Sequence, residues 1–513
     1  MGEDTKNKKI KRRVYLPPLK QYKQIGKELK PPFTTIDGIK LYSWANERMP
    51  EMLWAVLIRG HHVGSTPYAI FRDVLRWLGE QKKTIDGVTH TDIANYEDNL
   101  RRSFIQRIVA ATGTDALRPL LLLADLPAYD DWKSALNVDP VPEEDWDRMA
   151  RAVGKVMFHQ TQEATDCRWV KLVGSILAGK VHFTKGQEEI VESFNRYPNY
   201  GDQRKVRPSI RSMEMMETLT APKYQWAIKF WDYCYENTNC IPEINENSVT
   251  GLKRKQSEIT KHKKHYYSVT PGIRNALLTY FFKTSKTTAI DSRHETVFGI
   301  AIYALDIFIQ NFLLLTSATP AGRVSARIIL EAYLTLAYLM HKEEQGKMLW
   351  DAYRNYGTGQ ISLIERKYED QNYSSAMVDL KKMDAIANED KWSEFVPINL
   401  GHWDVSNLRQ ISIEIGEKEL YDKYYDYSSG YVHANWGAVR EAAFQSCYNP
   451  LHRQHRIPSY GLPILPNVNE DCRELINKIL DLVDKAYPNF RKRIARPPKS
   501  SGRQTSKDRG TAE

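Results

Sequence analysis

Apolar residues recur at steps of three and four residues along most of this 513-residue chain, and this spacing limits what it can fold into. Residues spaced in this way lie on one face of an α-helix. Clear runs of this kind are Tyr68–Glu80, Tyr96–Ala111 and Asn469–Tyr487. No strong run of alternating apolar and polar residues and no Asn-Gly hairpin signal is present. We therefore predict an all-α fold.

The length of the chain predicts more than one folded unit, because a domain usually contains roughly 100 to 200 residues. The apolar pattern thins between Asn237 and Val269, where Pro242 and two clusters of basic residues occur. We place a basic connector at residues 237–269, part of which is either a solvated helix or an exposed loop that binds an anion. The prediction is thus two helical-bundle domains, an N-terminal one at 33–236 and a C-terminal one at 270–490.

Positive charge is concentrated at the two ends of the chain. The first 30 residues carry a net charge of +7 and residues 491–513 carry +6, so the formal charge of +10 leaves the body near −3. We expect flexible basic tails at 1–32 and 491–513, and the charge does not imply a basic surface on the folded part. Such tails either solubilise the protein or hold phosphate backbones or anionic lipid heads without sequence specificity.

Several features predict a cytoplasmic protein without a transmembrane segment. The five cysteines are odd in number and lack the paired spacing of disulfide-rich domains. The N-terminus is charged and has no apolar run of the kind found in signal peptides. The longest apolar run, Phe298–Thr316, contains Asp306, Gln310 and Asn311, which is typical of a buried core helix.

A first candidate site lies on a helix in the C-terminal half. Arg323, Arg327 and Glu331 are four residues apart, so they line one face of a helix that is otherwise rich in Ile and Leu. An unpaired buried charge is costly, so the cluster is either a satisfied structural network or a prepared site. The expected partners of the two arginines in the preceding apolar helix are Glu295, Asp306 and Gln310.

A second candidate helix carries Tyr425, Ser429 and His433 on one face, and Arg440 follows seven residues later. Imidazole is suited to proton transfer near pH 7, and arginine can hold a phosphate or carboxylate with two hydrogen bonds. Together they fit acid–base chemistry on an anionic substrate. The alternative is a core histidine that Ser429 or a carbonyl satisfies.

Residues 290 to 445 resemble a bacterial family of unknown function. The shared pattern is an Arg-x-x-x-Glu helix, here Arg327 and Glu331, followed by a Ser-x-x-x-His helix, here Ser429 and His433. This part of the chain is also loosely similar to the HEPN helical-bundle nucleases of abortive-infection and toxin systems, which cleave RNA without a metal. Those enzymes use an arginine close before the histidine, whereas the six residues before His433 include none.

The resemblance implies a metal-independent ribonuclease of a defence or toxin system, acting on RNA or another phosphate-bearing ligand. In this hypothesis His433 transfers the proton, Arg327 stabilises charge on the phosphate and Glu331 orients them. The expected substrate contacts are Arg323, Ser429 and Arg440. The main alternative is a non-catalytic helical binding or scaffold module whose polar cluster is structural. Recognition of a small anion and self-association into a homo-oligomer also remain open.

We expect no metal and no cofactor. Cys447, His452 and His455 are close in sequence, but three ligands without a fourth make a poor structural zinc site. The sequence also contains no phosphate-binding, dinucleotide-binding, nucleophile-elbow or zincin motif.

Overall fold

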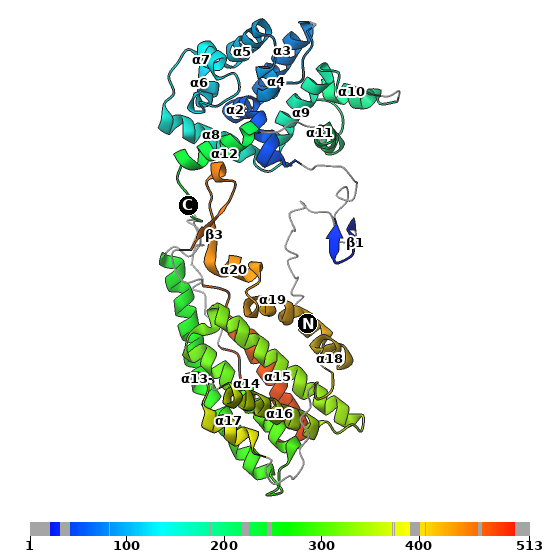
Figure 1. Ribbon diagram of the computed structural model, residues 1–513, viewed down its shortest axis with the longest axis vertical. Helices are drawn as coiled ribbons and strands as arrows, with labels where there is room; N and C mark the ends of the chain where they lie inside the picture. The colour runs from blue at the N-terminus through cyan, green and yellow to red at the C-terminus, as the bar shows by residue number, and fades with distance from the viewer. Residues whose placement is uncertain are drawn as a thin grey trace, which may run out of the picture. The chain divides into compact units, whose positions relative to one another are not determined.

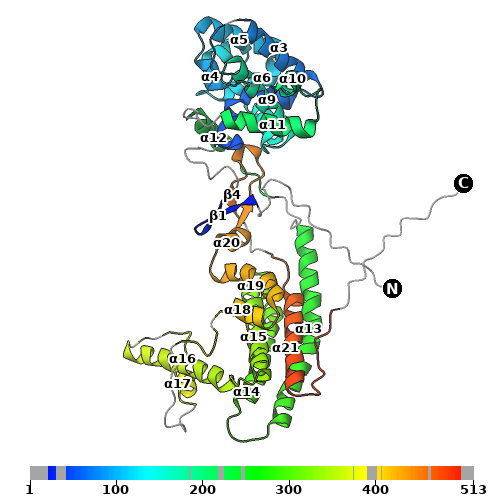
Figure 2. The same ribbon diagram turned by 90° about the vertical axis from the view of Figure 1, so that its right-hand side faces the viewer.

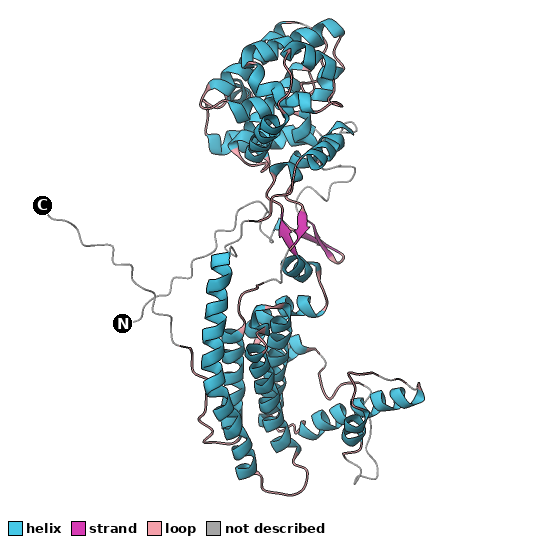
Figure 3. Ribbon diagram, turned by 90° about the vertical axis from the view of Figure 1, so that its left-hand side faces the viewer, coloured by secondary structure: helices cyan, strands magenta, loops and turns pink. Residues whose placement is uncertain are grey.

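The computed structural model describes residues 21–30, 42–81, 83–183, 186–217, 225–243, 249–371, 373, 375–389, 401–405, 407–459 and 464–497. The chain forms two compact units (Figure 1). Unit 1 comprises residues 1–243 and 446–456, and unit 2 comprises 244–445 and 457–513. Helices make up almost all of the regular structure in both units (Figure 3), which confirms the all-α prediction.

Helix α2 (Leu53–His61) is the centre of unit 1, because every residue from Leu53 to Ile58 is buried. It packs against α8 (Pro142–Val156) and α9 (Gln162–Leu177). Gly60 allows the close approach of α8, since a Cβ at this position would lie 2.4 Å from the Cβ of Ala152. A helix whose surface is apolar on all sides is stable only when other helices cover it on all sides, as they do here.

The other helices of unit 1 surround this centre. They are η2 (Trp44–Arg48), α1 (Met49–Glu51), α3 (Thr66–Glu80), α4 (His90–Ala94), α5 (Asp98–Thr112), α6 (Thr114–Leu117), η3 (Arg118–Leu122), α7 (Tyr129–Leu136), α10 (Glu188–Asn195), α11 (Gln203–Glu217) and α12 (Gln225–Asn237). The returning segment 446–456 adds η6 (Pro450–His452), which packs against α8 and α12 and buries Leu451 in the same core.

Strands are short and few in the described part of the chain. An antiparallel hairpin of β1 (Lys23–Ile25) and β2 (Glu28–Lys30) lies within the range predicted as the N-terminal tail. A second two-stranded sheet consists of β3 (Phe444–Ser446) and β4 (Arg456–Pro458), which flank the returning segment.

Helix α14 (Ser292–Leu313) is the centre of unit 2. It packs against α13 (Val249–Thr284), α15 (Pro320–Glu344) and α21 (Asn469–Ala486), and Figure 2 shows these long helices side by side. The remaining helices of the unit are η5 (Thr316–Ala318), α16 (Trp350–Asp370), α17 (Leu380–Ala387), α18 (Leu408–Glu414), α19 (Lys418–Val432) and α20 (Trp436–Ala443).

The composition of α14 is that of a core helix with one polar edge. In the described residues it is the one helix long and apolar enough to cross a membrane by length and composition. Its buried side chains include Phe298, Leu305 and Phe308. Asp306 accepts a hydrogen bond from Arg274 of α13 at 2.7 Å.

Two boundaries differ from those predicted from the sequence. Within the range 237–269, predicted as a connector that is partly helical or an exposed loop, the structure has a helix, because α13 starts at Val249 and continues through residue 269 to Thr284. Lysine and arginine thin the apolar pattern there, but both are good helix formers and do not end a helix. The second difference is the returning segment 446–456, which belongs to unit 1 although it follows most of unit 2 in sequence.

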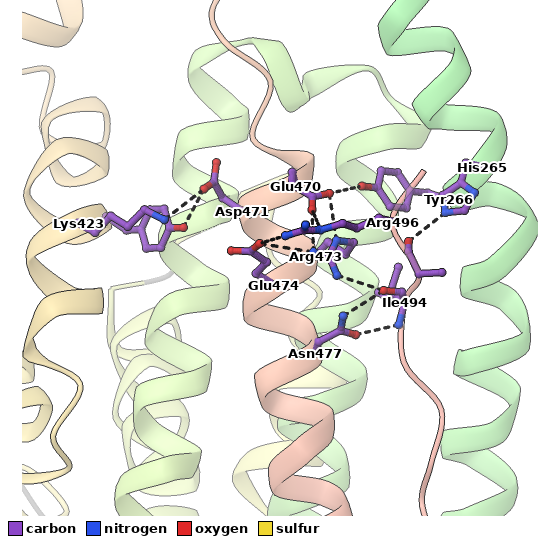
Figure 4. A network of polar contacts seen from close by, with 12 residues as sticks. His265, Tyr266, Lys423, Glu470, Asp471, Arg473, Glu474, Asn477, Ile494 and Arg496 are labelled. Atoms are coloured by element: carbon purple, nitrogen blue, oxygen red, sulfur yellow. Dashed lines mark hydrogen bonds and ion pairs between the residues drawn. The ribbon is translucent and has the colours of Figure 1, made fainter. Parts of the chain in front are cut away.

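Residues 491–497, predicted to be part of a flexible tail, instead lie against α21 and α13 (Figure 4). Ile494 is 1% exposed, and its backbone N–H donates to Asn477 Oδ1 at 2.8 Å. Arg496 forms ion pairs with Glu470 at 2.8 Å and with Glu474 at 2.9 Å. The basic charge that suggested a tail is thus partly neutralised by the acidic side chains of α21.

Candidate functional site

Arg327 of α15 is the centre of a polar cluster that joins α15 to α19. Its Nε donates to Glu331 Oε1 at 2.7 Å, and its Nη1 donates to Ser429 Oγ at 3.0 Å. Its Nη2 donates to the hydroxyl of Tyr425 at 2.9 Å. Glu331 lies one turn after Arg327, and Tyr425 and Ser429 lie one turn apart on α19. We call these four side chains the Arg327 cluster.

The Arg327 cluster is partly shielded from solvent. The side chains of Arg327 and Glu331 are 15% and 36% exposed. The Arg327 guanidinium also lies 4.6 Å from the centre of the Tyr425 ring, which itself stacks on Tyr421 at 4.5 Å. Burial acts to lower the pKa of Arg327, but the hydrogen bond and the charge of Glu331, together with the neighbouring tyrosines, outweigh it and raise the pKa above its usual value. Arg327 therefore stays positively charged. Its charge is paired with the carboxylate of Glu331, and its guanidinium also contacts the face of the Tyr425 ring.

Arg323 shares a helix face with Arg327 but binds different partners. Its guanidinium is buried and donates to the carbonyl of Pro466 at 2.6 Å from Nη2. Nη1 donates to the carbonyls of Thr319 at 3.3 Å and of Ser317 at 3.4 Å. Arg323 therefore fixes the backbone at the start of α15 rather than adding a donor to the Arg327 cluster.

Glu295 and Asp306, expected as partners of the two site arginines, pair with other arginines. Asp306 binds Arg274, and Glu295 lies 3.6 Å from Arg354 of α16. The expectation was wrong because helical spacing gives the face of a residue on its own helix but not which neighbouring helix that face meets.

His433 lies just beyond α19, at its C-terminal cap, and is exposed. Its backbone N–H donates to the carbonyl of Ser429 at 3.1 Å. The next residue, Ala434, has a φ of 49°, and this left-handed conformation ends the helix. Among the described residues, the His433 imidazole forms no hydrogen bond or ion pair. The structure thus places His433 one turn after Ser429 but does not bring its ring into the Arg327 cluster, and its exposure excludes a buried core histidine.

Arg440, the last predicted substrate contact, acts at a helix end. Its Nη1 donates to the carbonyl of Phe444, directly after α20, at 2.6 Å. Helix carbonyls near a C-terminus lack intrahelical partners, so this is a common place for an arginine. Of the six predicted site residues, Arg327, Glu331 and Ser429 therefore meet, whereas Arg323, His433 and Arg440 lie apart from them.

Unit 1 contains a buried ionic cluster that the sequence analysis did not predict. Glu214 of α11 pairs with Arg48, with Arg168 Nε at 2.7 Å and with Lys171 Nζ at 3.3 Å. Burial acts to raise the pKa of Glu214, but the three cations outweigh it and lower the pKa to about 2. The available signal was that Arg168 and Lys171 interrupt an otherwise apolar stretch of α9.

Glu51 of α1 is a second buried carboxyl of unit 1, at 1% exposure. Burial raises its pKa to about 7, although Thr91 donates to it from its backbone N–H at 3.0 Å and from its hydroxyl at 2.9 Å. Glu51 therefore changes its charge near neutral pH, inside the folded unit.

One group of described residues in unit 1 has the chemistry of a metal site. The ligand atoms of Cys240, Cys447, His452 and His455 all lie within 4.8 Å of one another. Three of these residues were considered from the sequence. Cys240 supplies the fourth ligand that the sequence analysis lacked, and it was missed because it precedes the others by more than 200 residues.

Comparison with known proteins gives one result. Residues 294–446 match the model of a family of unknown function, DUF5677. The matched range runs from α14 to β3 and includes the whole Arg327 cluster, so the expected resemblance to a family of unknown function is confirmed. No curated protein and no solved structure matches the chain.

Proposed function

We propose that unit 2 is a non-catalytic helical binding module in which the Arg327 cluster is a structural joint between α15 and α19. The observation that carries this proposal is that all three guanidinium nitrogens of Arg327 donate to protein acceptors. An arginine that binds a phosphate needs its paired donors free for the ligand. Three of the five N–H groups of Arg327, one on each nitrogen, are instead directed at Glu331, Ser429 and Tyr425.

The structural role follows from the cost of burying charge. A shielded guanidinium destabilises the fold unless a carboxylate and further hydrogen bonds compensate it. Glu331 compensates the charge from the same helix, and the hydroxyls of Ser429 and Tyr425 on α19 each accept one further hydrogen bond. Because these acceptors lie one turn apart on α19, the network also fixes the register of α19 along α15.

The surface for binding lies where α19 ends and α20 begins. Tyr427, Val432 and Trp436 are 52%, 45% and 64% exposed there. Large exposed aromatic side chains are typical of contact surfaces. Glu441 accepts hydrogen bonds from the hydroxyls of both Tyr427, at 2.9 Å, and Tyr431. A surface of exposed aromatic and apolar side chains favours a protein over a phosphate backbone, so we infer a protein partner, which includes a second copy of the chain.

A metal-independent ribonuclease is the second candidate function. The observation in its favour is the exposed imidazole of His433, one turn after Ser429, which is free to transfer a proton. In this mechanism Arg327 would have to exchange an α19 hydroxyl for a phosphate oxygen. The hypothesis that such a ribonuclease acts in a bacterial defence system rests on the family resemblance. The expectation that the protein is cytoplasmic rests on its composition.

RNA cleavage distinguishes the two candidates. Wild type, His433→Ala and the matched control His182→Ala, which replaces an exposed histidine of unit 1, are incubated with labelled total RNA. The assay is run without added metal and again with EDTA, and melting curves are recorded for each protein. The binding module predicts no cleavage by any of the three. Cleavage by wild type and His182→Ala that a well-folded His433→Ala protein lacks would establish the ribonuclease and contradict the module.

The choice of partner is tested separately by sedimentation of wild type and Trp436→Ser over a range of concentrations, and by capture of purified protein partners. Self-association that Trp436→Ser weakens would identify a second copy as the partner. Binding of RNA at the same surface, lost in Trp436→Ser, would contradict a protein partner.

A further inference from the structure

Two cysteines and two histidines of unit 1 converge at one point. Cys240 follows α12, and Cys447, His452 and His455 lie in the returning segment 446–456. Within the described parts of the chain this is the one group of histidine, cysteine and acidic side chains arranged to hold a metal ion. Neither candidate function of unit 2 uses these residues.

Three of the six separations between the ligand atoms are close to those of a tetrahedral site. Cys240 Sγ lies 3.4 Å from His452 Nδ1 and 3.3 Å from His455 Nε2, and Cys447 Sγ lies 3.5 Å from His452 Nδ1. With Zn–S near 2.3 Å and Zn–N near 2.0–2.1 Å, a tetrahedron has sulfur-to-nitrogen edges of about 3.6 Å. These three separations therefore need to change by only a few tenths of an ångström, and every other pair of ligand atoms lies within 4.8 Å.

Hydrogen bonds around Thr238 determine which ring nitrogen of His452 carries the proton. The hydroxyl of Thr238 donates its one proton to the carbonyl of Cys234 at 2.6 Å. It must therefore accept from His452 Nε2 at 3.0 Å, as it does from Asn449 Nδ2 at 3.0 Å. Nε2 then carries the proton, and the lone pair of Nδ1 faces the two sulfur atoms. Metal-binding histidines are oriented by this kind of hydrogen bond on the other ring nitrogen.

The backbone also holds the four ligands together. The N–H of Cys447 donates to the carbonyl of His455 at 2.9 Å, and the N–H of His455 donates to the carbonyl of His452 at 3.0 Å. Pro242 and Cys447 form an antiparallel bridge, which places the Cys240 segment beside the returning segment.

The backbone turn between His452 and His455 has an unfavourable conformation that metal binding would help to stabilise. Arg453 and Gln454 have φ values of 50° and 53°, both in the left-handed region that non-glycine residues rarely adopt. Such a conformation persists only when its surroundings compensate for it. The turn brings His455 back beside Cys240, and binding of an ion by both histidines would supply that compensation.

We propose that Cys240, Cys447, His452 and His455 bind one structural zinc ion. Two thiolates and two imidazoles in a tetrahedron are the preferred ligands of zinc. All four positions are filled by protein, so no site is left for water or substrate, and the role is structural. On binding, each thiol loses its proton to solvent, and the two thiolates neutralise the charge of the ion.

The four ligands come from the two separate chain segments that form unit 1. Cys240 lies near the end of the first segment of unit 1, and the other three ligands lie in the segment that returns after residue 445. The zinc ion ties these two segments of unit 1 together. Because closing a loop of about 200 residues is entropically costly, a cross-link at this point stabilises the unit by restricting its unfolded state.

The test uses the full chain purified under reducing conditions. Metal content is measured by mass spectrometry, and the metal-free protein is titrated with Zn²⁺ and with Co²⁺. The variants are Cys240→Ser, which replaces an exposed side chain outside the core, and His455→Ala. The controls are Cys472→Ala, a buried cysteine of unit 2, and His182→Ala.

We expect about one zinc per wild-type chain, a tetrahedral Co²⁺ spectrum with thiolate charge transfer, and a melting temperature that rises with Zn²⁺. Both ligand variants should bind zinc at least about tenfold more weakly, while both controls bind it as wild type does. Three results would overturn the proposal: reduced wild type that takes up neither metal, Cys240→Ser that retains wild-type affinity, or a disulfide between Cys240 and Cys447 in protein purified with reductant.

Discussion

The Nη1 group of Arg327 donates to Ser429 Oγ at 3.0 Å, and this bond joins two helices through residues that are 102 positions apart in the chain. Arg327 supplies the charge from α15, and Ser429 and Tyr425 supply acceptors from α19. Three of the residues in the catalytic pattern predicted from the sequence, Arg327, Glu331 and Ser429, are thus hydrogen-bonded to one another in the folded unit, whereas His433 lies outside this network.

Replacement of Arg327 by Met should destabilise unit 2. Met keeps much of the aliphatic volume but leaves Glu331, Ser429 and Tyr425 without their shared donor, which we expect to cost about 1–3 kcal/mol. Urea unfolding measures the change. Arg366→Met, which replaces an exposed arginine of α16, is the matched control and should alter stability by less than about 0.5 kcal/mol.

Glu51 predicts a pH dependence of the stability of unit 1. Its pKa is raised by burial from 4.5 to about 7, so the protonated form stabilises the fold. This contribution is complete below about pH 4.5 and is lost as the pH rises through about 7. Glu51→Gln stays neutral, so its stability relative to wild type should rise by up to about 3 kcal/mol between pH 5 and pH 8.5. Unfolding curves across this range that remain parallel for the two proteins would contradict the ionisation of Glu51.

Glu214 predicts the opposite dependence. Its pKa is lowered to about 2 by the cations around it, so the ionised form stabilises the fold, and the contribution is lost as the pH falls below about 4.5. Glu214→Gln leaves the charges of Arg48, Arg168 and Lys171 without their buried anion, and we expect a loss of about 3–5 kcal/mol at pH 7. A variant as stable as wild type in thermal unfolding at pH 7 would show that these cations are compensated elsewhere.

Two glycine substitutions should have opposite effects. Gly60→Ala places a Cβ 2.4 Å from the Cβ of Ala152, so α2 and α8 must move apart, at a cost of about 1–3 kcal/mol. Gly299→Ala lies on an exposed edge of α14 with no atom within 4 Å of the new Cβ. It should stabilise the helix by about 0.5–1 kcal/mol. Melting curves check both, and a stabilised Gly60→Ala protein would contradict the close packing of α2 on α8.

The sequence predicted local features well and long-range contacts poorly. The core helices α14 and α15 follow from their apolar spacing, and so does the face shared by Arg327 and Glu331. The extension of the α19 face to His433 and Arg440 was less successful, because the left-handed turn at Ala434 ends the helix first. A left-handed residue after a helix is usually glycine or asparagine, so the sequence around Ala434 does not predict this turn.

The other omissions concern partners that are distant in the chain. Cys240 comes 207 positions before Cys447, and Glu214 comes 166 positions after Arg48, so neither pairing has a fixed spacing that a motif could reveal. The ordered residues 491–497 were missed for the same reason. Their basic side chains predict a solvated tail. The structure shows that the acidic side chains of α21 lie beside them and form ion pairs with Arg496.

The most direct test of the central claim is a double-mutant cycle between Arg327→Met and Ser429→Ala, measured by urea unfolding with RNA cleavage assayed on the same samples. A structural joint predicts a coupling energy of about 0.5–1.5 kcal/mol between the two residues and no cleavage by any of the four proteins. Additive effects on stability, together with cleavage by wild type that the folded Arg327→Met protein lacks, would contradict the structural role and assign Arg327 to catalysis.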